Sequence, residues 1–190
     1  MQVDMALFTR DEAGFAREAM ELVMTEQWDI VMLDISLPDR SGLEVLKAIK
    51  KARPALPVLV LSMYPVDQYA LRVLRAGGAG YLTKESAPDQ LLEAVRRITS
   101  GMRYITPEVA ECIAQDWNRN PVQSIHETLS DREFEVMRLI ASGKSVGDIA
   151  KDLSLSVKTV STYRTRVLQK LHLRHNAELT HYAVINNLIY

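Results

Sequence analysis

The stretch from Leu129 to Leu171 constrains the fold most strongly, because it contains three helix start signals in close succession. A serine stands at each predicted N-cap: Ser130, Ser145 and Ser156. The first serine is followed three positions later by Glu133, which gives the S-x-x-E pattern of a capping box. Gly143 ends that first helix, because glycine tolerates the left-handed backbone that closes many helices. The stretch therefore predicts three consecutive short helices.

The third predicted helix is basic over its whole length. Its cationic residues are Lys158, Arg164, Arg166 and Lys170, with no acidic residue among them. A short helix, a tight turn and a longer basic helix form the arrangement that inserts one helix into the major groove of DNA. A purely structural bundle is the alternative, but its helices more often mix charges for pairing four residues apart. The sequence therefore predicts DNA binding.

Charge is divided unequally along the chain. Residues 1–117 contain 13 Lys and Arg against 17 Asp and Glu, a net charge of −4. Residues 118–190 contain 10 against 7, a net charge of +3, so the overall −1 conceals two halves of opposite sign. The positive half contains the basic helix, which supports the prediction of DNA binding.

The composition excludes several protein classes. With 190 residues, 47% of them hydrophobic, the chain suits one large domain or two small ones. Its apolar runs are too short to span a membrane, and no signal peptide is expected from its first residues. Cys112 is the single cysteine, so no internal disulfide is expected and a cytoplasmic location is predicted. His172 and His175 lack a neighbouring cluster of Cys or carboxylate ligands, which disfavours a metal site there.

The first hundred residues alternate apolar strand patterns with helical patterns, which predicts a parallel α/β sheet. The predicted strands cover residues 3–8, 30–33, 58–61 and 81–83. The predicted helices cover residues 12–25, 67–76 and 88–99, with a further helix marked by Leu43, Leu46 and Ile49. A linker helix with Pro107 in its first turn and a connection over residues 118–127 then lead to the basic half.

Three successive predicted strands end in polar residues, namely Asp34, Ser62 and Lys84. Because the carboxyl ends of parallel strands share one edge, reaction sites gather there. A carboxylate at that edge can form an aspartyl phosphate, a hydroxyl can hydrogen-bond the phosphoryl oxygens, and an ammonium can neutralise their charge. The alternative is that all three are ordinary polar residues at loop starts. The motifs LDISLPDRSG and GYLTK around them favour a phosphoryl site.

These motifs resemble the receiver domain of bacterial two-component response regulators, and the basic segment resembles the LuxR-type helix-turn-helix. Together the whole chain is similar to the NarL/FixJ family. The resemblance implies an α/β flavodoxin-like receiver, N-terminally incomplete, followed by a small all-α helix-turn-helix domain. The expected boundaries are residues 1–100 for the receiver, 101–123 for the linker and 124–190 for the DNA-binding domain.

The same resemblance assigns roles to residues of the receiver. Asp34 is expected to be the phosphoacceptor, and Ser36 to lend its main-chain carbonyl, beside Asp34, to the implied cofactor Mg²⁺. Pro38 and Gly42 are expected to shape the loop that follows. The expected phosphate-switch residues are Ser62, Tyr81 and Lys84. A sensor histidine kinase is the implied partner.

One departure from the family affects the metal. Receivers begin with a strand that ends in an acidic pair, whereas Val3–Phe8 matches the second strand of the family. The first strand and its acidic pair are therefore expected to be missing, and poor Mg²⁺ binding and poor phosphorylation are expected. Asp11 and Glu12 are alternative ligands. A regulator of the same build that no longer uses phosphate is the alternative function.

An enzyme is the third possibility, in which Asp34 would turn over a phosphorylated substrate. Haloacid-dehalogenase-type enzymes use a D-x-D motif, and here Ser36 occupies the second acidic position. This difference disfavours a phosphatase or phosphotransferase.

The resemblance also implies how the C-terminal half is used. The expected contacts with double-stranded DNA are Lys158, Thr159, Ser161, Thr162, Arg164, Thr165 and Arg166. The expected homodimer contacts on the last helix are Leu179, Tyr182 and Ala183. The alternative for that helix is that it packs the small bundle. In this family the receiver is expected to cover the DNA-binding surface until it is phosphorylated.

Overall fold

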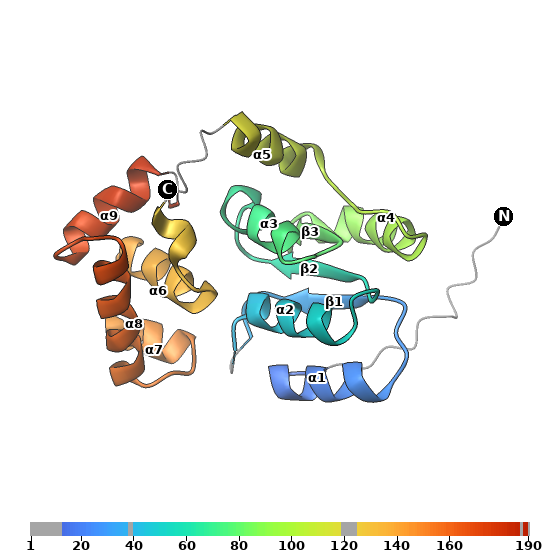
Figure 1. The fold of residues 1–190 in the computed structure, drawn as a ribbon, viewed down its shortest axis with the longest axis horizontal. Helices are drawn as coiled ribbons and strands as arrows, with labels where there is room; N and C mark the ends of the chain where they lie inside the picture. The colour runs from blue at the N-terminus through green and yellow to red at the C-terminus, as the bar shows by residue number, and fades with distance from the viewer. Residues whose placement is uncertain (1–12, 38–39, 119–124, 187, 190) are drawn as a thin grey trace.

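The computed structural model describes residues 13–37, 40–118, 125–186 and 188–189. In the N-terminal half, three parallel strands form a sheet in the order β1-β2-β3 (Figure 1). The strands are β1 (Val31–Asp34), β2 (Val58–Ser62) and β3 (Gly80–Thr83). These strands confirm three of the four predicted ones, whereas the predicted strand Val3–Phe8 lies outside the described residues.

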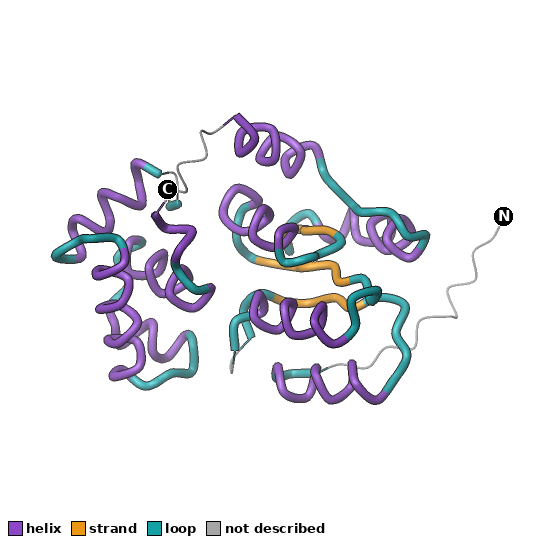
Figure 2. The backbone as a smooth tube through the Cα atoms, in the orientation of Figure 1, coloured by secondary structure: helices purple, strands orange, loops and turns teal. Residues whose placement is uncertain are grey.

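Helices cover both faces of this sheet, as the tube drawing shows (Figure 2). They are α1 (Ala16–Thr25), α2 (Gly42–Ala52), α3 (Val66–Arg75) and α4 (Ala87–Thr99). Because side chains alternate along a strand, Val58 and Val60 pack with α1, α2 and α3, while Leu59 packs with α4. The predicted α/β receiver fold is confirmed for the described part of the chain.

One part of the sheet is thinly covered. Among the described strands, β1 pairs with β2 alone. Met32 of β1 lies in register with Leu59 of β2. Helix α4 packs on this face of the sheet over β2 and β3. Met32 and Leu92 of α4 are each about half exposed, so apolar surface lies open beside α4.

The C-terminal half is helical, as predicted. Its elements are α5 (Pro107–Asn118), the 3₁₀ helix η1 (Ile125–Thr128), α6 (Asp131–Ala141), α7 (Val146–Asp152), α8 (Val157–Lys170) and α9 (Asn176–Ile185). Each predicted serine cap accepts a hydrogen bond from the backbone N–H three residues on, and the capping box of Ser130 and Glu133 is complete. Gly143 has the expected left-handed backbone, with φ of +88°.

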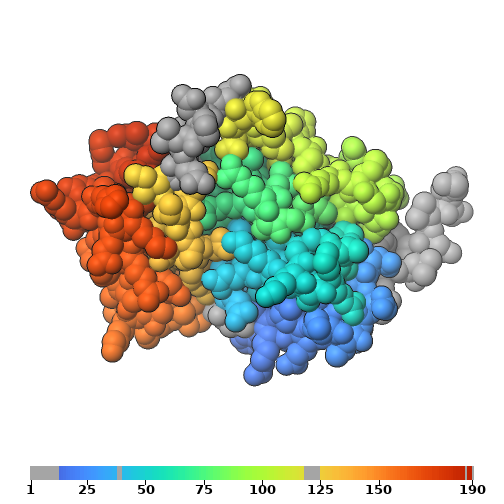
Figure 3. Space-filling model, viewed as in Figure 1, coloured from blue at the N-terminus to red at the C-terminus, as the bar shows by residue number. Residues whose placement is uncertain are grey.

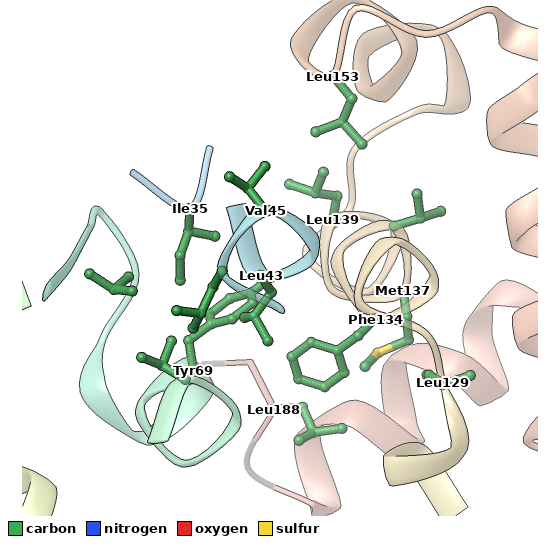
Figure 4. Close-up of a cluster of buried hydrophobic side chains, with 14 of the residues drawn as sticks. Ile35, Leu43, Val45, Tyr69, Leu129, Phe134, Met137, Leu139, Leu153 and Leu188 are labelled. Atoms are coloured by element: carbon green, nitrogen blue, oxygen red, sulfur yellow. The ribbon is translucent and has the colours of Figure 1, made fainter. Parts of the chain in front are cut away.

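Helix α6 lies between the rest of its own bundle and the receiver (Figure 1). All eleven residues of α6 are buried, including its charged ones. Its side chains Phe134, Met137 and Leu139 join one hydrophobic cluster with Leu43 and Tyr69 of the receiver (Figure 4). In the space-filling view the golden side chains of α6 abut those of α2 and α3 (Figure 3). The two halves therefore share a core.

No helix in the described ranges is both long and apolar enough to cross a lipid bilayer.

Candidate phosphoacceptor site and DNA-recognition helix

Asp34 and Lys84 meet at the carboxyl edge of the sheet. The Lys84 Nζ donates to Asp34 Oδ2 at 2.6 Å, although the two residues are 50 positions apart in sequence. The parallel register aligns Asp34 with Leu61 of β2 and Ser62 with Thr83 of β3, which brings three strand ends to this edge. The Asp34 side chain is 28% exposed, so a phosphoryl donor can reach its carboxylate.

Ser62 and Tyr81 both hold Tyr64, to which the sequence assigned no role. The Tyr64 N–H donates to the Ser62 Oγ at 3.0 Å, and the Tyr81 hydroxyl donates to the Tyr64 carbonyl at 2.6 Å. Ser62 and Tyr81 have no exposed surface. Burial raises the pKa of Tyr81 to about 12, although the Ser62 hydroxyl acts in the opposite direction. Tyr81 therefore stays neutral, and its hydroxyl donates a hydrogen bond to the loop after β2.

The loop after Asp34 is tightly closed. The Ser36 N–H donates to Asp34 Oδ1 at 2.9 Å, and the Gly42 N–H donates to the Ile35 carbonyl at 2.9 Å. A Cβ at position 42 would lie 2.2 Å from the Asp34 carbonyl oxygen, so only glycine fits there. Pro38, which was expected to shape this loop, lies outside the described residues.

The residues described at this edge do not form a full ligand set for Mg²⁺. This ion requires near-octahedral oxygen ligands, usually with one or two carboxylates. Within the described ranges, no three residues of the His, Cys, Asp and Glu types are grouped so as to hold a metal ion. Asp34 and the Ser36 carbonyl are the two expected contributors that are described. The alternatives Asp11 and Glu12 lie outside those ranges.

Helix α8 presents a polar face to solvent. Its exposed residues include Lys158, Ser161, Thr162, Thr165 and Arg166. Its buried side is formed by Val160, Val167 and Leu168, which join the bundle core. The exposed face of this helix therefore contains five of the seven expected DNA contacts.

Four expected DNA contacts on α8 make hydrogen bonds within the domain. The hydroxyls of Thr162 and Thr165 donate to the backbone carbonyls of Lys158 and Ser161, at 2.9 Å and 3.0 Å. Arg164 is partly buried, and its Nε donates to Asn176 Oδ1 at 2.6 Å. The Thr159 hydroxyl lies 2.8 Å from the hydroxyl of the N-cap Ser156. Arg166 is exposed, which makes it the more available cation for a phosphate.

Two of the three expected dimer contacts on the last helix are core residues. Leu179 and Ala183 have no exposed surface, because α9 packs these side chains against α6. The Tyr182 hydroxyl lies 3.0 Å from Nδ1 of His126, in a hydrogen bond to the start of the domain. Leu179 and Ala183 therefore serve the packing of the bundle, which was the alternative for this helix. Val184 and Ile185 are its exposed apolar residues.

The receiver contacts α6 and leaves the recognition face of α8 open. This corrects the expectation that the receiver covers the DNA-binding surface. The Asp131 carboxylate receives Lys47 Nζ at 2.7 Å and lies 3.6 Å from Arg72 Nη1. Arg75 bridges Asp116 of α5 and Glu127 of η1, at 2.7 Å and 3.0 Å. The contacts between the two halves lie mainly between α2 and α3 of the receiver and η1 and α6 of the DNA-binding domain.

Comparisons with known proteins give the same two parts. Residues 3–96 match the response regulator receiver domain, and residues 127–183 match the bacterial regulatory proteins of the luxR family. The response regulator UvrY of Escherichia coli K12 is 34% identical over 178 residues, which cover 93% of this chain and 82% of UvrY. The oxygen regulatory protein NreC of Staphylococcus carnosus is 36% identical over 186 residues, with 94% and 86% covered.

Solved structures resemble most of the chain or about half of it. RcsB of Salmonella enterica serovar Typhimurium, bound to the promoter P1flhDC in the presence of the phosphomimetic BeF₃⁻, matches at a TM-score of 0.50 with 26% identity. That match covers 89% of this chain and 81% of RcsB. A LuxR-family two-component response regulator from Aurantimonas sp. matches at 0.51 with 33% identity, covering 55% of this chain and 75% of its own. The chain belongs to the NarL/FixJ family of two-component response regulators.

Proposed function

We propose that this protein is a transcription regulator that binds DNA through α8 and is controlled by phosphorylation of Asp34. The contact of 2.6 Å between Lys84 and Asp34 at the carboxyl edge of the sheet supports this role most directly. It pairs a partly exposed nucleophile with a cation that can neutralise an added phosphoryl group. The proposed phosphoryl source is a sensor histidine kinase, and the proposed setting is the cytoplasm.

In the proposed transfer, a carboxylate oxygen of Asp34 attacks the phosphorus of a phosphohistidine. The new O–P bond forms as the N–P bond breaks, and the imidazole leaves with the electron pair and takes up a proton. Lys84 then lies beside the added negative charge, where it stabilises the acyl phosphate. The Ser62 hydroxyl is the proposed donor to a phosphoryl oxygen.

The proposed DNA contacts are the exposed residues of α8. Arg166 and Lys158 are placed to meet phosphates, and the hydroxyls of Ser161, Thr162 and Thr165 to meet base edges. A hydroxyl group can form hydrogen bonds with several different bases, so these residues give only a moderate sequence preference. A homodimer on DNA is proposed because two copies would double the number of phosphate contacts.

Intact mass after incubation with acetyl phosphate in buffer containing Mg²⁺ tests the phosphoacceptor. The wild-type protein should gain the mass of one phosphoryl group, and Asp34→Asn should gain none. Asp29→Asn is a matched control, because Asp29 is exposed and lies just before β1. Labelling of Asp34→Asn, or failure of the wild type to label, would contradict the proposal. Steady release of inorganic phosphate would instead indicate an enzyme.

A further inference from the structure

Helix α5 packs on the receiver along one of its sides. Val109 has no exposed surface, and Cys112 and Asp116, three and seven positions farther along the helix, are partly buried. This side contacts α3, where Arg75 Nη2 lies 2.7 Å from Asp116 Oδ2. Helix α5 lies at the outside of the molecule, beyond α3 (Figure 1). The packing on α3 therefore uses one side of α5 and leaves other sides facing solvent.

An apolar stripe runs along an exposed side of α5. It consists of Ala110, Ile113, Ala114 and Trp117, which follow the i, i+3, i+4, i+7 spacing of a single helix face. All four residues are exposed, Ile113 by 38% and Trp117 by 88%. We call these four residues the α5 stripe. An apolar face with this spacing is typical of a helix that packs against a partner.

The α5 stripe is complementary in shape to a second copy of itself. In a twofold-symmetric pair, residue i of one copy contacts residue j of the other, and j contacts i. Two antiparallel α5 helices with the axis between Ile113 and Ala114 would place Trp117 opposite Ala110 of the second copy. Ile113 would lie opposite Ala114 of the second copy. Each large side chain then meets a small one, as in closely packed helices.

The charges of α5 do not oppose this pairing. Its acidic residues are Glu108, Glu111 and Asp116, and none of them belongs to the α5 stripe. Glu111 Oε1 accepts a hydrogen bond from Gln115 Nε2 at 3.0 Å, and Asp116 is paired with Arg75. The stripe can therefore be covered without the burial of an unpaired charge, which would be costly.

The α5 stripe is too small to hold two copies together in dilute solution. An aromatic side chain such as Trp117 buries about 200 Å², whereas a stable complex buries at least roughly 1,200 Å² in total. Two copies bound side by side on DNA have an effective concentration on the order of millimolar, at which a weak contact forms. The contact therefore acts when DNA holds two copies together.

We propose that a second copy of this chain docks on the α5 stripe, by antiparallel pairing of the two α5 helices, and that this contact makes DNA binding cooperative. This inference rests on the proposed function, in which two copies bind DNA. It places a contact between the copies outside the helix-turn-helix and outside α9. The contact requires no change at Asp34.

Mobility shifts of the full chain on two mixed-sequence duplexes test the contact, one duplex long enough for two copies and one for a single copy. Ala114→Glu places a charge opposite Ile113 of the second copy and should lower cooperativity on the long duplex about tenfold. Trp117→Ala should lower it similarly. Gln115→Glu is the matched control, because it adds the same charge one position away and outside the stripe. Binding to the short duplex should be equal for Ala114→Glu and Gln115→Glu.

Sedimentation equilibrium at about millimolar concentration tests the same contact without DNA. The wild type and Gln115→Glu should associate weakly, and Ala114→Glu and Trp117→Ala should associate less. If all four proteins show the same cooperativity and the same self-association, the contact is overturned. Failure of the wild type to bind either duplex would instead contradict the proposed function, and the sedimentation result would still decide the contact.

Discussion

The guanidinium of Arg72 lies 3.8 Å from the centre of the Phe134 ring, so a cation of the receiver rests on an aromatic face of α6. The same group donates to the carbonyls of His126 and Leu129, at 2.9 Å and 3.4 Å. Burial lowers the pKa of Arg72, while Asp131 acts to raise it. Arg72 therefore satisfies several groups where the two domains meet.

Replacement of Arg72 by alanine should weaken the shared core. Loss of the cation–π contact and of the charged hydrogen bonds should lower the free energy of unfolding by about 2 kcal/mol. Urea denaturation of the full chain measures this change. Arg17→Ala is the control, because the Arg17 side chain is 89% exposed and its Nε lies 4.0 Å from Glu21 Oε1, in a weak surface ion pair. Equal stability of the two variants would contradict the role of Arg72.

Replacement of Lys84 by alanine should slow labelling of Asp34 by acetyl phosphate by at least about tenfold. The reason is the loss of the cation that neutralises charge on the phosphoryl group. Rates of mass gain measure this effect. Lys51→Ala, at an exposed position on α2, should label as fast as the wild type. A normal rate in the Lys84 variant would remove this lysine from the site.

Replacement of Gly42 by alanine should disturb the loop that holds Asp34. The new Cβ would lie 2.2 Å from the Asp34 carbonyl oxygen, so the backbone must move, at a cost of about 2 kcal/mol of stability. The temperature of thermal unfolding should fall, and the rate of labelling by acetyl phosphate should fall with it. Gly14→Ala is the matched control, since nothing lies within 4 Å of its added Cβ. Wild-type behaviour of Gly42→Ala would show that the loop is not closed as described.

Replacement of Arg166 by alanine should flatten the salt dependence of DNA binding. Each lost phosphate contact lowers the slope of log K against log salt by about 0.9. Mobility shifts on a mixed-sequence duplex over a salt series measure the slope. Arg164→Ala should change it less, because Arg164 is engaged by Asn176. An unchanged slope for Arg166→Ala would place this residue outside the interface.

Glu133 and Glu135 should respond to pH with opposite signs. Burial acts to raise the pKa of Glu133, but Lys170 at 2.6 Å and the bonds from Ser130 outweigh it and lower the pKa. Its stabilising effect is present above the unfolded pKa and is lost as pH falls through the folded one. Burial raises the pKa of Glu135, although Arg132 acts against it. The stability that protonated Glu135 contributes is therefore fully present below the unfolded pKa and is lost as pH rises through the folded pKa.

Denaturation curves over a pH series separate the two carboxylates. Glu133→Gln keeps a capping side chain and should reduce the loss of stability in acid. Glu135→Gln should reduce the loss of stability as pH rises from about 4.5. Matching pH profiles for the two variants would show that the two environments do not differ as described.

Much of the fold could be predicted because its signals are local. The caps Ser130, Ser145 and Ser156 act within three residues of themselves, so the sequence is enough to locate each helix start. The alternation of strand and helix patterns predicted a parallel sheet. Because parallel strands end at one edge, it also predicted that Asp34 and Lys84 lie at the same edge.

The sequence by itself thus determined the two domain types, the polar residues at the sheet edge and the basic helix. Only the tertiary structure decided that α6 docks on α2 and α3, that Arg72 joins the two domains, and that Leu179 and Ala183 are core residues. The reason is physical, because these contacts join residues far apart in sequence, such as Arg72 and Leu129, which are 57 positions apart. Contacts of this kind leave no periodic pattern in the sequence. Both faces of α6 are buried, and a helical pattern shows that a face is apolar without showing which partner covers it.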